Sequence, residues 1–135
     1  NTDQAGVVIE LDLASRDSRF FIPPDSLQGL HDGVWIDERF YVTESGANRV
    51  AWREPDGALV HRDILPENYF VRGLCDTGAS WLVGFTTQRG TQQPALIIEY
   101  DREFERTIQT MDISSLYPPT KSTAIHAIIH APDEG

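Results

Sequence analysis

The sequence is poor in cysteine and in positive charge. Its 135 residues include one cysteine, Cys75, so neither an internal disulfide nor a cysteine-rich zinc site can form. Lysine and arginine total 11 against 21 acidic residues, which gives a net charge of −10 and a field that repels phosphate backbones. Nucleic acid and anionic membranes are therefore unfavourable partners.

Long apolar runs and common catalytic motifs are also missing. No stretch approaches the roughly 20 apolar residues of a membrane helix, and residues 1–4 carry neither a basic leader nor an apolar signal core. We expect no targeting signal and favour a cytoplasmic location. The absence of Gly-x-Ser-x-Gly, HExxH and a phosphate-cradling glycine loop removes several common enzyme classes.

What the sequence does contain is the composition of one globular domain and an internal repeat. Hydrophobic residues make up 40% of the chain and charged residues 24%. Recurrence about every 44 residues is typical of propellers and solenoids. The matching stretches are residues 7–12 with 96–101 (offset 89) and 49–54 midway between them, 29–32 with 73–76 (offset 44), and 40–42 with 81–83 (offset 41).

Each repeat predicts four short strands separated by turns. Apolar and polar residues alternate, and turn residues recur every 8 to 12 positions, as in all-β folds. A helix over residues 101–116 is an alternative for the last strand, because Phe104, Ile108 and Met111 have helical spacing. The predicted strands are residues 6–13, 18–23, 33–37, 39–44, 49–53, 58–64, 70–76, 81–86, 95–100 and 107–113.

Four-stranded repeats of this length, arranged radially, predict β-propeller blades of four antiparallel strands. The chain would form one segment: a blade remnant (6–24), two blades (29–65 and 70–113) and the start of a next blade (124–131). Propellers need about four to eight blades to close, so we expect an incomplete ring with open edges. The start without methionine also suggests a trimmed protein or part of a longer one. We expect either a longer propeller or a homo-oligomer that completes the ring.

Two stretches resemble known propeller families. The run YVTESGANRV at 41–50, followed by Pro-Asp-Gly at 55–57, resembles NHL-type repeats and virginiamycin B lyase-like propellers. The runs YFVRGL at 69–74 and LVGFT at 82–86, with Arg89, are similar to a group of uncharacterised bacterial propeller proteins. The resemblance implies a six-bladed parent fold. It implies little about chemistry, because propellers host lyases, lactonases, lectins and scaffolds, and no lyase catalytic set matches here residue by residue.

The resemblance also implies that the first strand of each blade lines a central channel with ligands at its mouth. Histidine and carboxylate together can bind a divalent metal or act as a base and its electrostatic partner. For His31 and Asp32, the alternative is a structural hydrogen-bonded pair. For His126 and His130, the alternative is that they are ordinary polar residues facing the channel. The candidate ligand-binding residues are His31, Asp32, Arg72, Asp76, His126 and His130, of which His31, His126 and His130 are also candidate metal ligands.

Other polar residues have two interpretations each. Arg72 can bind the carboxylate or phosphate of an anionic ligand, or pair with Asp76 or an aspartate of the next blade. Cys75 would be nucleophilic only beside a cation, and its apolar setting favours a packed thiol. Glu44 and Asn48 flank a turn, where they offer oxygen ligands to Ca²⁺ or Mg²⁺ or are simply solvated.

Two functions are consistent with these residues. The first is a noncatalytic module that binds a small molecule or a protein with a loop face. The second is a metal-dependent hydrolase or lyase that uses His31, His126 or His130 at the channel mouth, with a divalent ion as cofactor. No catalytic residue is assigned, so the sequence leaves open whether the protein is an enzyme.

Overall fold

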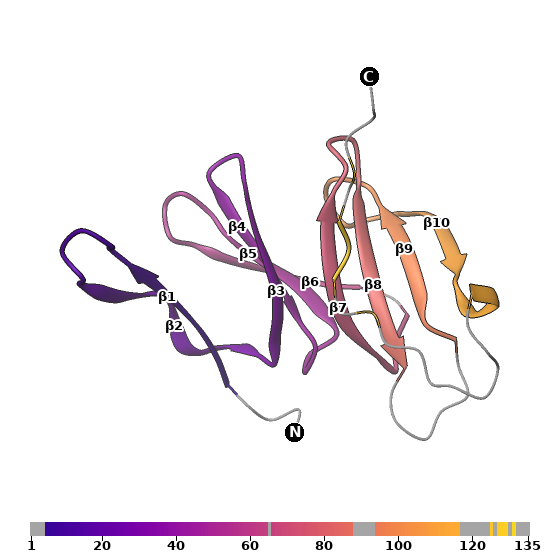
Figure 1. Cartoon of the computed structure of the whole chain (residues 1–135), viewed down its shortest axis with the longest axis horizontal. Helices are drawn as coiled ribbons and strands as arrows, with labels where there is room; N and C mark the ends of the chain where they lie inside the picture. Colours follow the sequence, from indigo (N-terminus) through magenta and orange to yellow (C-terminus); the bar gives the residue numbers. More distant parts are fainter. Residues whose placement is uncertain are drawn as a thin grey trace.

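The computed structural model describes residues 5–64, 66–87, 94–116, 125, 127–129 and 131. Its strands form three antiparallel sheets that follow one another along the molecule in chain order (Figure 1). The first sheet contains β1 (Ala5–Leu11) and β2 (Ser18–Gln28); the second contains β3 (Leu30–Ile36), β4 (Arg39–Glu44), β5 (Arg49–Arg53) and β6 (Leu59–Asp63); the third contains β7 (Tyr69–Asp76), β8 (Trp81–Thr87), β9 (Leu96–Tyr100) and β10 (Thr107–Asp112).

These sheets confirm the prediction of an all-β fold with open, four-stranded antiparallel sheets. The predicted strands 39–44 and 49–53 coincide with β4 and β5. The helical alternative over 101–116 is wrong, because residues 107–112 pair with β9 and only the short 3-10 helix Ser114–Leu116 follows. No helix among the described residues is long and apolar enough to cross a membrane.

Turn chemistry explains where the strands of the second sheet reverse. Asn48 adopts a left-handed backbone with φ of 52° between β4 and β5, a conformation that asparagine tolerates. Gly57 has φ of 95° between β5 and β6, and the carboxylate of Asp56 accepts a hydrogen bond from the Ala58 amide at 2.9 Å. Both turns therefore reverse the chain where the sequence places asparagine or glycine.

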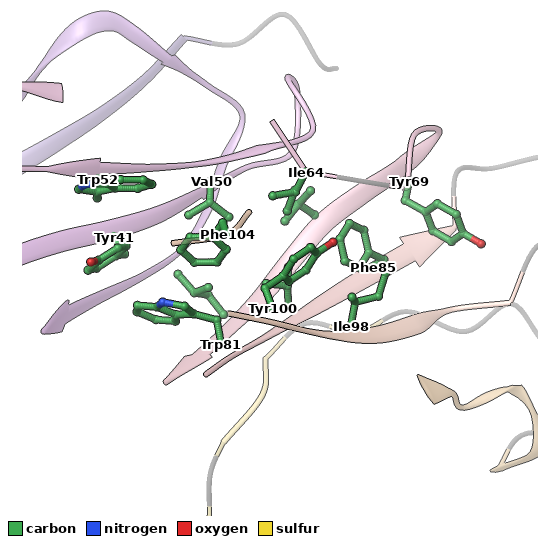
Figure 2. Close-up of a cluster of buried hydrophobic side chains, with 13 residues drawn as sticks. Tyr41, Val50, Trp52, Ile64, Tyr69, Trp81, Phe85, Ile98, Tyr100 and Phe104 are labelled. Atoms are coloured by element: carbon green, nitrogen blue, oxygen red, sulfur yellow. The ribbon is translucent and has the colours of Figure 1, made fainter. Parts of the chain in front are cut away.

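Apolar side chains on both faces of the second sheet hold the three sheets together. On one face, Val42 and Ala51 pack with Ile22 and Leu27 of β2. On the other face, the second and third sheets share an aromatic core, which Figure 2 shows between the two sets of strands. Because neighbouring residues of a strand point to opposite faces, β4 and β5 contribute to both cores. The aromatic core is built around Tyr41, Val50, Trp52, Trp81, Val83, Phe85, Ile98, Tyr100 and Phe104.

The pairing register shows how the second and third sheets correspond. Val42 lies opposite Ala51, and Val83 lies opposite Ile98. Val42 and Val83 are 41 residues apart in the sequence, whereas Ala51 and Ile98 are 47 apart. The difference of six arises because ten residues, 86–95, separate the last pair Phe85–Leu96, whereas four residues, 45–48, separate the pair Glu44–Arg49. The repeat of about 44 residues is therefore an average of two structural offsets.

The residues near the C-terminus lie on the outward face of the third sheet. The Thr86 hydroxyl donates to the Ile125 carbonyl at 3.1 Å and accepts from the Ile125 amide at 2.9 Å. Gly84 makes this approach possible, because a Cβ atom there would lie 2.6 Å from Ile125 Cγ2. Gly73 is under the same constraint, since its Cβ would lie 2.9 Å from Ile128 Cγ1.

Candidate functional site

The inner seam of the molecule is the place where β3 and β7, the first strands of the two four-stranded sheets, contact each other. Both strands are bulged at the same point of their pairing with the second strand. The bulge of β3 holds residues 31–32, and that of β7 holds residues 72–73. His31 and Arg72 therefore occupy equivalent positions on neighbouring sheets. Bulges re-aim side chains and are common beside binding sites.

The sequence alignment of residues 29–32 with 73–76 does not describe equivalent positions. Trp35 lies opposite Phe40, and Asp76 lies opposite Trp81 in the same register. Asp76 thus corresponds to Trp35, at the far end of its strand, and not to Asp32. Hydrogen-bond pairing with the second strand determines which residues correspond, and a short local similarity does not.

Asp32 joins the two sheets across the seam. Its amide donates to Thr43 Oγ1 at 3.0 Å, and the same hydroxyl donates to the Arg72 carbonyl at 2.9 Å. Its carboxylate accepts from the Leu74 amide of β7 at 3.0 Å and from the Gly33 amide at 2.9 Å. Both carboxylate oxygens are occupied by backbone donors, so Asp32 positions β7 against β3.

The Arg72 side chain is half-buried at this seam, with its guanidinium carbon 5.3 Å from the centre of the Phe70 ring. Burial lowers the pKa of the Arg72 guanidinium. Among the described residues, no carboxylate lies within ion-pair distance of it. Six other described arginines do have such a partner: Arg19 with Glu10, Arg39 with Glu54, Arg49 with Glu44, Arg62 with Glu105, Arg102 with Asp76 and Arg106 with Asp101.

Asp76 has a different partner from the one considered in the sequence. Its carboxylate forms an ion pair with Arg102 and accepts from the Gly78 amide at 2.9 Å. The Arg102 guanidinium also lies over the Trp81 ring, 4.6 Å from its centre. The Arg72–Asp76 pair is therefore not formed. Cys75 is buried next to this cluster, in agreement with a packed thiol.

The histidine candidates are only partly within the described residues. His31 is exposed on β3, at the bulge of that strand. His126 and His130 lie outside the described residues. In the part of the chain that the structure describes, no three His, Cys, Asp or Glu side chains are grouped to hold a metal ion. A metal ion bound by His31, His126 and His130 stays a prediction.

A buried charged cluster, which the sequence interpretation missed, lies at the end of β4. Glu44 is fully buried, and its carboxylate accepts from Arg49 Nε at 2.6 Å, Arg49 Nη2 at 3.2 Å and the Gln28 amide at 2.9 Å. His61 Nδ1 lies 3.0 Å from the same carboxylate. Glu44 is thus neither a solvated turn residue nor open to a metal ion. The available signal was its position opposite Arg49 across the predicted hairpin.

Asn48, the other turn residue considered as a metal ligand, ties the second sheet to the chain that leaves it. Its side-chain amide donates to the Ile64 carbonyl at 2.9 Å and to the Pro66 carbonyl at 2.8 Å. A surface depression of about 290 Å³ lies beside it, and others of about 350 and 310 Å³ lie along β1 and β2. None of these three is lined by the seam residues.

Comparisons of the chain with protein-family models, with curated proteins and with solved structures found no match. The geometry of the seam and the charges that surround it are therefore the features from which a function can be inferred.

Proposed function

We propose that the protein is a ligand-binding module built on β-propeller blades, and that Arg72 anchors an anionic group of the ligand. Two four-stranded sheets stacked through their faces, with their first strands in contact, support the blade interpretation. The bulges at equivalent points of β3 and β7 bring His31 and Arg72 to the same edge of neighbouring sheets. The ligand class is a small molecule or protein segment that carries a carboxylate or a phosphate.

The observation that carries this proposal is the unpaired state of Arg72 among the described residues. A half-buried cation without a nearby carboxylate is costly, because burial removes hydration without supplying a counter-charge. In a chain of net charge −10, carboxylates are abundant, yet none of the described ones reaches this guanidinium. A ligand carboxylate or phosphate would supply the missing charge through charge-assisted hydrogen bonds.

Thermal melting with inorganic phosphate and with citrate tests the proposal. A ligand that binds the native state raises the melting temperature in proportion to ln(1 + [L]/Kd). We expect this rise in the native protein and its loss in Arg72→Met. Arg19→Met is the matched control, because Arg19 is exposed in an ion pair with Glu10 and should leave the rise unchanged. An equal rise in Arg72→Met, or no rise in the native protein, would contradict the proposal.

The metal-dependent hydrolase or lyase stays a prediction. It needs His126 or His130 beside His31, and both lie outside the described residues.

A further inference from the structure

One face of the first sheet exposes a continuous apolar surface. Ile9 lies opposite Phe20 in the β1–β2 pairing, so both project from the same face, together with Val7 and Leu11 two residues to either side of Ile9. Their exposed fractions are 41% for Val7, 56% for Ile9 and for Leu11, and 60% for Phe20. We call these four side chains the leading face. Contiguous apolar surface of this kind marks an interaction site.

The repeat shows what such a face contacts in the other two sheets. By the matching hexads, Ile9 corresponds to Ala51 in β5 and to Ile98 in β9, and Leu11 corresponds to Tyr100. Ala51 is 0% exposed and packs on the first sheet, while Ile98 is 4% exposed and packs against the second. Tyr100 is 3% exposed in the same core. In both four-stranded sheets, the residue equivalent to Ile9 faces the preceding sheet. The leading face is therefore a surface for sheet stacking.

The opposite end of the stack carries a face of the complementary kind. Tyr41 and Val50 of the second sheet are among the side chains that cover β9. The register makes Leu82 and Ile97 their equivalents in the third sheet, where both project outward and are partly exposed. They lie beside Gly84, the part of this face that Ile125 covers. Met111 lies opposite Ile97 and is also partly exposed. We call Leu82, Ile97 and Met111 the trailing face.

We propose that the leading face of one copy of this chain packs on the trailing face of a second copy, in a head-to-tail contact. The contact repeats the geometry by which the second sheet covers the third. This contact between copies goes beyond the proposed function, because the evidence for it is the observed stacking of sheets and not Arg72 or its ligand. A symmetric contact between two leading faces would leave both trailing faces uncovered, whereas the head-to-tail contact covers one face of each kind.

Light scattering of the purified chain over a range of concentrations tests this inference. One copy has a mass of 15.2 kDa, and we expect the native chain to reach the mass of two copies or more as concentration rises. Ile9→Glu and Met111→Glu should each give a single-copy mass, because a buried glutamate has no partner in the contact. Ile108→Glu is the matched control: Ile108 is 55% exposed on β10 and belongs to neither face, so the native mass should persist.

Mixing the two blocked variants separates head-to-tail association from other modes. Ile9→Glu retains an intact trailing face and Met111→Glu an intact leading face, so the mixture should form a 1:1 complex of two copies. Near-UV circular dichroism of each variant confirms that the aromatic core is folded. A native chain that stays a single copy overturns the proposal. It is overturned equally if only Ile9→Glu blocks association, which indicates symmetric pairing, or if folded blocked variants do not combine.

Discussion

Replacing Glu44 by glutamine tests how much the buried cluster at the end of β4 contributes to stability. The substitution keeps the size of the side chain and one acceptor oxygen, which can still bind the Gln28 amide. An NH₂ group then faces Arg49 Nε and His61 Nδ1, where the carboxylate oxygen lay 2.6 and 3.0 Å away. Breaking a buried ion pair by removing one partner costs about 3–5 kcal/mol. The Arg49 and His61 side chains are 26% and 32% exposed, so water can solvate them partly and the expected loss is roughly 2–3 kcal/mol.

The assay is reversible thermal or urea unfolding of the native protein and Glu44→Gln. A loss of this size lowers the melting temperature by roughly 10 °C for a chain of this length. Glu10→Gln is the control, because Glu10 and Arg19 form an exposed pair with side chains 46% and 72% accessible. We expect that control to change the stability by less than about 1 kcal/mol. Equal effects of the two substitutions would refute the conclusion that burial makes the Glu44 cluster strong.

Three further predictions follow from other contacts. Gly84→Ala should detach the residues around Ile125, because the new Cβ lies 2.6 Å from Ile125 Cγ2; faster hydrogen exchange of the Ile125 amide would show it, and unchanged protection would contradict it. Thr43→Val should cost roughly 1–3 kcal/mol of unfolding free energy, since the Asp32 amide loses its acceptor and the Arg72 carbonyl its donor. Burial raises the pKa of Tyr100 in the folded protein. The contribution of Tyr100 to the free energy of unfolding is therefore intact below the unfolded tyrosine pKa of about 10, and it is lost as the pH rises above that value. In urea titrations at alkaline pH, the slope of the unfolding free energy against pH should approach about 1.4 kcal/mol per pH unit and should be smaller in Tyr100→Phe. An unchanged slope in Tyr100→Phe would exclude Tyr100 as the cause.

The strands were predictable because they depend on local patterns. Residues 39–44 and 49–53 alternate and are joined by a turn with glycine and asparagine, so both β4 and β5 follow from periodicity and turn chemistry alone. The last strand of the third sheet, β10, was harder to predict. Ile108 and Met111 fit both a helix and a strand, and pairing with β9 decides for the strand. That pairing joins distant residues and is not encoded in the short segment itself.

The candidate site was less predictable because its roles depend on contacts between sheets. Asp32 lies on β3, the first strand of the second sheet, and its carboxylate binds the Leu74 amide of the next sheet. Asp76 was placed beside it by a local similarity that the pairing register does not support. Glu44 looked like a turn residue, because nothing in its neighbourhood indicates that Gln28 and His61 cover it. Burial of a charge is a property of the assembled sheets.

The unlike ends of the stack determine how assembly proceeds once it starts. A contact between two different surfaces leaves one of each free on the product, so growth stops only where the rotation between neighbours closes a circle, and otherwise continues as a filament. A chain with a blocked leading face then acts as a terminator, because its intact trailing face adds to a leading end and its own blocked leading face cannot accept the next copy. Small proportions of such a chain should shorten the polymers, with the average length set by the mixing ratio.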